Sequence, residues 1–154
     1  MKQIKLHHLE DTMQFASFLA QRIKPGTVIC LEGDLGAGKT TFTQFFCRAL
    51  EVDDYVTSPT FNLMNIYQGK LQDQTIDIYH FDVYRIFDAD EMLEIGFDDY
   101  LNGTGICIVE WATQVMDLLP EKRIWITLTH MESGGRLLVV DGLDAEGEDA
   151  CIIK

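Results

Sequence analysis

The chain has no apolar segment that approaches the about 20 residues a membrane-spanning helix needs, and it begins with the polar residues Met1-Lys2-Gln3. No basic segment followed by an apolar stretch and a cleavage site is present, so we see no export signal. The four cysteines are far apart and include no Cys-x2-Cys pair, which argues against a disulfide framework and a structural zinc site. We therefore expect a cytoplasmic protein without a membrane partner.

Basic residues are scarce as well. The sequence has 12 Lys and Arg residues against 25 Asp and Glu residues, which gives a formal net charge of −13. A surface of this sign repels a nucleic-acid backbone, so tight RNA binding by this chain alone is not expected. Solubility is the ordinary explanation of such acidity.

One motif dominates what is present. Residues 33–40 read Gly-Asp-Leu-Gly-Ala-Gly-Lys-Thr, which matches the phosphate-binding loop pattern Gly-x4-Gly-Lys-Ser/Thr. Glycines let backbone N–H groups turn towards an anionic phosphate, and the N-terminus of the following helix adds partial positive charge. Lys39 would reach the β- and γ-phosphates, and the Thr40 hydroxyl would bind Mg²⁺. The motif predicts a nucleoside triphosphate site, and the absence of an Asn-Lys-x-Asp guanine-reading motif favours ATP.

The surrounding pattern places this loop between a strand and a helix. An apolar run at 27–32 predicts a buried parallel strand, and 41–50 predicts the helix that leaves the loop. Further helices are predicted at 9–24, ended by Pro25-Gly26, and at 88–95, with Asp88 as its N-cap. The remaining predicted strands are 61–67, 75–81, 106–109, 123–129 and 136–140.

These elements predict one α/β domain over residues 1–154, with an acidic tail at about 144–154. The strands at 61–67 and 75–81 form a hairpin whose turn begins at 68–70, and the last two strands form a second hairpin. The expected architecture is a P-loop NTPase-like three-layer fold. Its central sheet is mostly parallel and is extended by antiparallel hairpins.

Polar residues follow two of the apolar strands expected near the loop. Ligands of such sheets collect at the carboxyl ends of parallel strands. Glu110 is therefore placed to bind Mg²⁺ directly or through water, and Asp82 to orient an attacking water, although a structural role for Asp82 is equally open. His80 is interpreted as a packed or hydrogen-bonded histidine, and Arg85 as the partner of an acid or a phosphate.

A further loop follows the predicted helix at 41–50. Ser58 and Thr60 flank Pro59 there, where nucleotide switches often place hydroxyl groups that sense the γ-phosphate. The spacing alone favours a plain turn over such a switch.

Four motifs taken together cover nearly the whole chain. They are the loop at 33–41, Ser58-Pro59-Thr60-Phe61, His80-Phe81-Asp82-Val83-Tyr84-Arg85, and Val109-Glu110-Trp111-Ala112. In this order and in a chain of this size, they resemble the bacterial TsaE family. The resemblance implies a small ATPase needed to make threonylcarbamoyladenosine in tRNA, beside the anticodon of tRNAs that read codons beginning with A.

The resemblance also implies roles for individual residues. The implied catalytic residues are Lys39, Asp82 and Glu110; the implied Mg²⁺ ligands are Thr40 and Glu110; the implied nucleotide-sensing switch contains Ser58 and Thr60. Thr12 lies in a segment similar to one where the family places a threonine near the base, and Arg136 matches a late Gly-Arg pair. The implied nucleotide contacts are Thr12, Asp34, Leu35, Gly36, Ala37, Gly38, Lys39, Thr40, Thr41 and Arg136.

The resemblance further implies protein partners, namely a TsaD-type threonylcarbamoyl transferase subunit and its TsaB-type paralogue. Contact with tRNA would be indirect, through this complex, which agrees with the charge of −13. We expect slow ATP hydrolysis by the chain alone, because its five arginines are scattered and no arginine finger is evident. A small-molecule P-loop kinase and a noncatalytic nucleotide-gated interaction module stay as alternatives.

Overall fold

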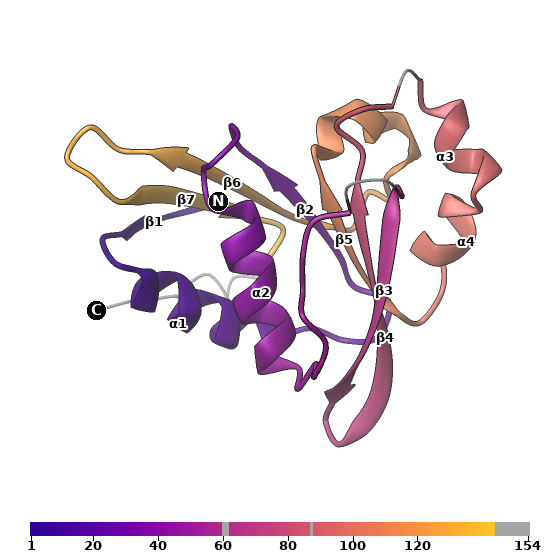
Figure 1. Ribbon diagram of the computed structural model, residues 1–154, viewed down its shortest axis with the longest axis horizontal. Coiled ribbons are helices and arrows are strands. Elements are labelled where there is room, and N and C mark those ends of the chain that lie inside the picture. The colour runs from indigo at the N-terminus through magenta and orange to yellow at the C-terminus, as the bar shows by residue number, and fades with distance from the viewer. Residues whose placement is uncertain (60–61, 87, 144–154) are drawn as a thin grey trace.

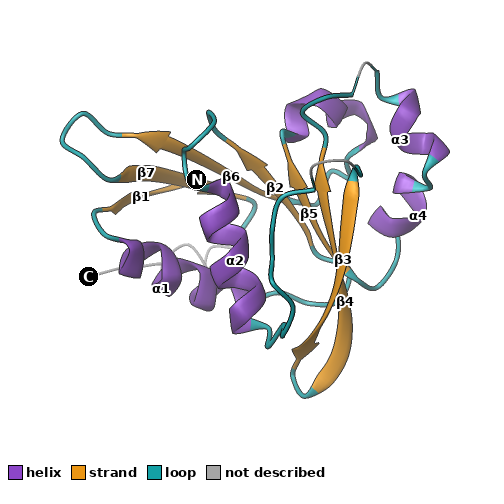
Figure 2. Ribbon diagram, viewed as in Figure 1, coloured by secondary structure: helices purple, strands orange, loops and turns teal. Residues whose placement is uncertain are grey.

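A computed structural model describes residues 1–59, 62–86 and 88–143. In chain order the elements are β1 (Lys2–Leu6), α1 (Leu9–Ala20), β2 (Val28–Glu32), α2 (Lys39–Ala49), β3 (Met64–Leu71), β4 (Gln74–Asp82), α3 (Asp90–Glu94), α4 (Phe97–Leu101), β5 (Ile106–Glu110), the 3₁₀ helix η1 (Ala112–Leu118), β6 (Ile124–His130) and β7 (Arg136–Asp141). Figures 1 and 2 show their arrangement. None of the helices in the described ranges has both the length and the apolar character needed to cross a membrane.

The strands form a seven-stranded sheet in the order β1-β7-β6-β2-β5-β4-β3 (Figure 1). At its centre β6, β2, β5 and β4 run parallel to one another. At one edge β3 pairs antiparallel with β4, and at the other β7 pairs antiparallel with β6 and β1. The predicted α/β architecture, a parallel centre extended by antiparallel hairpins, is therefore confirmed.

The two strands β2 and β5 are buried and apolar up to their terminal glutamates, Glu32 and Glu110, because helices cover both of their faces. Successive side chains of a strand point to opposite faces, so Ile29 and Leu31 of β2 join one hydrophobic core while Val28 and Cys30 join the other. The first core lies between the sheet and helices α1 and α2, where the rings of Phe15 and Phe42 are 5.9 Å apart. The second core lies under α3, α4 and η1.

The two cores also account for the cysteines. Cys30, Cys47 and Cys107 are buried and free, and burial raises the pKa of each thiol to about 12. A thiol with so high a pKa is not ionised at neutral pH, so these side chains act as small apolar groups. Cys151 lies outside the described residues.

The hairpin of β3 and β4 has a different turn from the predicted one. The chain turns at Gln72 and Asp73, which have positive φ angles of 52° and 65°, and not at 68–70. Gly69 instead lies within β3, where a Cβ atom would be 2.5 Å from the carbonyl oxygen of Leu50. The glycine therefore marks a close approach between two backbone segments rather than a turn.

Other differences concern short elements. β1 was not predicted, although Ile4 and Leu6 alternate as its buried residues, and α4 and η1 were also missed. Helix α1 ends at Ala20 rather than at 24. The helix predicted at 88–95 is confined to α3 with Ala89 as its N-cap, so the prediction that Asp88 is the N-cap is wrong. Asp88 instead accepts the N–H of Asp90 through Oδ1 at 2.9 Å.

Candidate functional site

The glycine-rich loop connects β2 to the N-terminus of α2, as predicted. Gly33 has a φ angle of +149°, and a Cβ atom there would lie 2.4 Å from the carbonyl oxygen of Leu128, so only glycine fits between β2 and β6. Gly36 and Gly38 also have positive φ angles, of +79° and +109°, but a Cβ atom at either would meet no atom within 4 Å. The loop is thus anchored at Gly33 and faces open space at Gly36 and Gly38, which leaves room for a ligand against the backbone.

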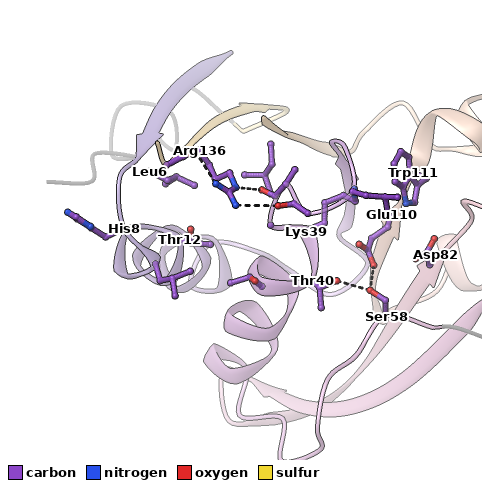
Figure 3. A pocket seen from close by; sticks show the side chains of 18 of the residues that line it. Leu6, His8, Thr12, Lys39, Thr40, Ser58, Asp82, Glu110, Trp111 and Arg136 are labelled. Carbon is purple, nitrogen blue, oxygen red and sulfur yellow. Dashed lines mark hydrogen bonds between the residues drawn. The ribbon is translucent and has the colours of Figure 1, made fainter. Parts of the chain in front are cut away.

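A cleft of about 540 Å³ opens beside this loop, where the carboxyl ends of β2, β5 and β4 meet (Figure 3). The register places Glu110 of β5 opposite Asp82 of β4 and opposite Leu31 of β2. This volume lies within the range of small-molecule and cofactor sites. The cleft is lined by Leu6, His7, His8, Leu9, Thr12, residues 35–41, Ser58, Asp82, Glu110, Trp111, Leu128, Gly135 and Arg136.

Lys39, the first residue of α2, is buried and turns back on the loop. Its Nζ donates hydrogen bonds to the carbonyl oxygens of Gly33 and, at 3.2 Å, of Asp34. The same atom lies 3.9 Å from the centroid of the Trp111 ring, a cation–π contact. Burial lowers the pKa of Lys39 below its ordinary value, while the Glu110 carboxylate acts in the opposite direction.

A chain of hydrogen bonds joins the loop helix to β5. The Oγ1 of Thr40 lies 2.7 Å from the Oγ of Ser58, which donates to Oε2 of Glu110 at 3.3 Å (Figure 3). Because the single hydroxyl proton of Ser58 is used on Glu110, Thr40 donates to Ser58. The same Oε2 also lies 2.7 Å from Nε2 of His80. Glu110 and His80 are 2% and 0% exposed.

The group formed by Thr40, Ser58 and Glu110 has the donor chemistry of a magnesium site. Two hydroxyl oxygens and one carboxylate lie within hydrogen-bond contact at the edge of the cleft. Magnesium prefers oxygen ligands and is commonly held by few protein groups together with waters and phosphate oxygens. The residues present therefore fit the ion. Thr40 and Glu110, the two predicted ligands, are linked through the Ser58 hydroxyl, and their binding of Mg²⁺ stays a prediction.

Asp82 lies on the wall of the same cleft, at the end of β4 (Figure 3). Burial raises the pKa of its carboxyl group, which is only partly offset by the hydrogen bond that Oδ1 accepts from the Tyr84 N–H at 3.1 Å. The nearby Glu110 carboxylate raises this pKa further. A carboxylate held in this way is a stronger proton acceptor than an exposed one.

Thr12 and Arg136 lie at the opposite end of the cleft, next to the segment that follows β1 (Figure 3). Arg136 donates from Nε to the carbonyl oxygen of Ala37 at 3.1 Å and from Nη2 to that of Gly36 at 3.3 Å. It therefore holds the loop itself. Direct contact of Thr12 and Arg136 with a nucleotide stays a prediction, and Thr60 lies outside the described residues.

Two features of the cleft were not predicted. Trp111 adopts a φ angle of +62°, which is rare for a bulky residue, and its ring lies against Lys39 and at 4.6 Å from that of Tyr84. The cleft is also bounded by residues 6–9. The strand that precedes these residues, β1, could have been found from the alternation of apolar and polar residues in Lys2–Leu6. Five residues are too few, however, to establish a two-residue period.

The fold and the loop together define the class of protein. A sheet with a parallel centre, a Gly-x4-Gly-Lys-Thr loop between a central strand and a helix, and an acid at the end of the adjacent strand are together the architecture of P-loop proteins.

Comparisons with known proteins identify the family. The family model described as "Threonylcarbamoyl adenosine biosynthesis protein TsaE" matches residues 6–138. The tRNA threonylcarbamoyladenosine biosynthesis protein TsaE of Bacillus subtilis is 43% identical over 130 residues, 83% of this chain and 78% of that protein. Its counterpart from Treponema pallidum is 34% identical over 131 residues, 85% of this chain and 93% of that protein. The chain belongs to the TsaE family.

A solved structure shares the fold of this chain. The crystal structure of Bacillus subtilis YdiB superimposes with a TM-score of 0.73 and 35% sequence identity, over 97% of this chain and 92% of that one. The family predicted from four sequence motifs is therefore confirmed by the sequence comparisons, and the predicted fold by the structure comparison.

Proposed function

We propose that this TsaE family member is a magnesium-dependent ATPase that acts in the threonylcarbamoyladenosine modification of tRNA, with residues 1–154 as a single ATPase domain. The observation that carries the proposal is the hydrogen-bonded group of Thr40, Ser58 and Glu110 beside the phosphate-binding loop. The pathway follows from the family and from its relatives, which are named tRNA threonylcarbamoyladenosine biosynthesis proteins. Because this pathway modifies tRNA, we propose that the protein acts in the cytoplasm.

The chain's own groups supply most of what phosphoryl transfer to water requires. The loop N–H groups and Lys39 would bind the phosphates, with Lys39 exchanging its carbonyl partners for phosphate oxygens. Thr40 and Glu110 would hold Mg²⁺ directly or through water. When bound, the ion would neutralise charge on the β- and γ-phosphate oxygens.

Asp82 would orient the attacking water. Water attacks the γ-phosphorus, the bond from that phosphorus to the β–γ bridging oxygen breaks, and ADP and inorganic phosphate form. The water proton passes to the Asp82 carboxylate, whose pKa burial raises towards the value of an effective base. Trp111 covers Lys39 and limits the access of bulk water to it.

We propose that the ATPase works on a complex of a TsaD-type transferase subunit and its TsaB-type paralogue, and that tRNA is bound by this complex. The net charge of −13 makes the chain a poor ligand for tRNA by itself, which supports indirect contact. No arginine other than Arg136 lines the described cleft, so a partner would supply further positive charge in the transition state.

The test is ATP hydrolysis by the purified chain, alone and with both partner subunits, for wild type, Lys39→Ala and Glu110→Ala. We expect slow hydrolysis alone, a rise of at least tenfold with partners, and loss of both in the two variants. Arg123→Ala is the matched control, because Arg123 contacts Pro120 and Met116 away from the cleft.

The outcomes separate the competing functions. Hydrolysis that partners do not change would refute partner activation, and ADP release that depends on a small-molecule acceptor would identify a kinase instead. An Asp82→Ala variant that cannot hydrolyse ATP yet still supports tRNA modification would identify a noncatalytic nucleotide-gated module.

A further inference from the structure

The carboxylate of Glu110 is held by two donors on one oxygen. Both Nε2 of His80, at 2.7 Å, and Oγ of Ser58, at 3.3 Å, contact Oε2. Ser58 comes from the loop after α2, whereas His80 comes from β4, the strand that pairs with β5. The shorter of the two contacts therefore comes from the rigid sheet.

His80 occupies a position where an apolar residue would serve the fold better. It is fully buried, and its Nδ1 is a buried polar atom with no hydrogen-bond partner among the described residues. An unpaired buried polar atom destabilises a fold, and an apolar side chain of similar size would avoid that cost. The neighbouring residue on the same face of β4, Ile78, is apolar and belongs to the core under α1 and α2. The side-chain contact of His80 with Glu110 is therefore what distinguishes this histidine from a core residue.

The contact also determines which nitrogen carries the proton. A carboxylate oxygen only accepts hydrogen bonds, so Nε2 of His80 must be the donor.

We propose that His80 is a positioning residue for the magnesium–nucleotide centre: its Nε2–H donates to Oε2 of Glu110 and fixes the rotamer in which that carboxylate serves the ion. The inference rests on the proposed function, since it assumes that Glu110 holds Mg²⁺. Removing a residue that hydrogen-bonds to a metal ligand and orients it typically lowers metal affinity or activity about 10- to 100-fold. His80 is not among the residues that line the described cleft, so it would act only through Glu110.

The experiment measures the dissociation constant of ATP by calorimetry, once in EDTA and once in excess Mg²⁺. The ratio of the constant in EDTA to the constant in Mg²⁺ reports how strongly the ion supports binding. His80→Leu removes the donor and fills the space, and His80→Gln returns an N–H donor near the position of Nε2. Ile78→Val is the matched packing control, on the same face of the same strand. We expect His80→Leu to lower the ratio about 10- to 100-fold with unchanged binding in EDTA, while His80→Gln and Ile78→Val stay near wild type.

A double-mutant cycle with Glu110→Gln separates positioning from a structural role. If His80 acts through Glu110, His80→Leu causes no further loss in the Glu110→Gln background. A normal ratio in His80→Leu with a reduced one in Glu110→Gln would overturn the positioning role and leave the proposed function intact. An unchanged ratio in Glu110→Gln would overturn the magnesium role of Glu110 itself. Equal losses by His80→Leu in both backgrounds would show a merely structural effect and overturn the inference.

A spectroscopic measurement needs no variant to fold. The ¹⁵N chemical shifts of the His80 ring in the nucleotide-free protein show which ring nitrogen carries the donated proton. We expect a proton on Nε2. A ring protonated only at Nδ1 cannot donate to Glu110, and that result would overturn the inference.

Discussion

Replacing Arg136 with alanine tests whether the second hairpin holds the phosphate-binding loop. Arg136 at the start of β7 reaches the carbonyl oxygens of Gly36 and Ala37, about a hundred residues away in the chain. In a trans peptide the carbonyl and the N–H of the next residue point in opposite directions. When Arg136 holds a carbonyl, the next N–H therefore points away from Arg136. We infer that the guanidinium preorganises the loop backbone that the proposed function assigns to phosphate binding.

The magnitude follows from the two hydrogen bonds. Bonds from a charged but partly exposed donor to the carbonyl oxygens, at 3.1 and 3.3 Å, together contribute about 1–2 kcal/mol. At about 1.4 kcal/mol per tenfold, Arg136→Ala should weaken nucleotide binding roughly 5- to 30-fold. Because the loop holds phosphates without the ion, the loss should be the same in EDTA and in Mg²⁺.

Calorimetric titration with ATP and ADP measures this effect. Arg123→Ala removes the same charge far from the cleft and should bind both nucleotides as wild type does. Arg136→Lys should recover little, because one ammonium group cannot reproduce the planar fork that spans two carbonyls. Wild-type affinity in Arg136→Ala would refute the reasoning, and an equal loss in Arg123→Ala would show that only net charge matters.

The remaining predictions concern the loop glycines and Asp82. Gly33→Ala should lower the free energy of unfolding by about 2–3 kcal/mol, because its Cβ would collide with the Leu128 carbonyl. Gly36→Ala, in open space, should lower it by about 1 kcal/mol, for its φ angle alone. Equal urea unfolding midpoints for the two variants would contradict the geometry. Burial raises the pKa of Asp82 above 3.8, so the folded state binds more protons than the unfolded state between 3.8 and the raised pKa, and the contribution of Asp82 to stability falls as pH rises through that window. Asp82→Asn keeps an acceptor for the Tyr84 N–H, so it should be more stable than wild type at pH 7 but not below pH 3.8. The variant should also lose ATP hydrolysis. Urea unfolding at both pH values measures the stability, and a variant less stable than wild type at pH 7 would contradict the prediction.

The parts of the fold that were predicted correctly depend on residues close together in sequence. The apolar run before the loop and the hydrophobic spacing after it predict β2 and α2 because both patterns repeat within a few residues. The turn of the first hairpin was misplaced because Gly69 looks like a turn residue, yet it is needed for the approach of Leu50, which no local pattern reveals. The turn at Gln72 and Asp73 has no glycine to mark it.

The phosphate-binding loop can be predicted from local sequence alone, since consecutive residues 33–40 carry both the backbone conformation and the Lys39 and Thr40 side chains. The partners of Glu110 and of Arg136, in contrast, follow from the folded arrangement of the strands. His80 meets Glu110 because β4 and β5 pair in parallel in one register, and Arg136 meets the loop because β7 is the strand beyond β6. Such contacts depend on strand register and on which face each side chain takes, and these are settled by burial of the whole sheet rather than by neighbouring residues.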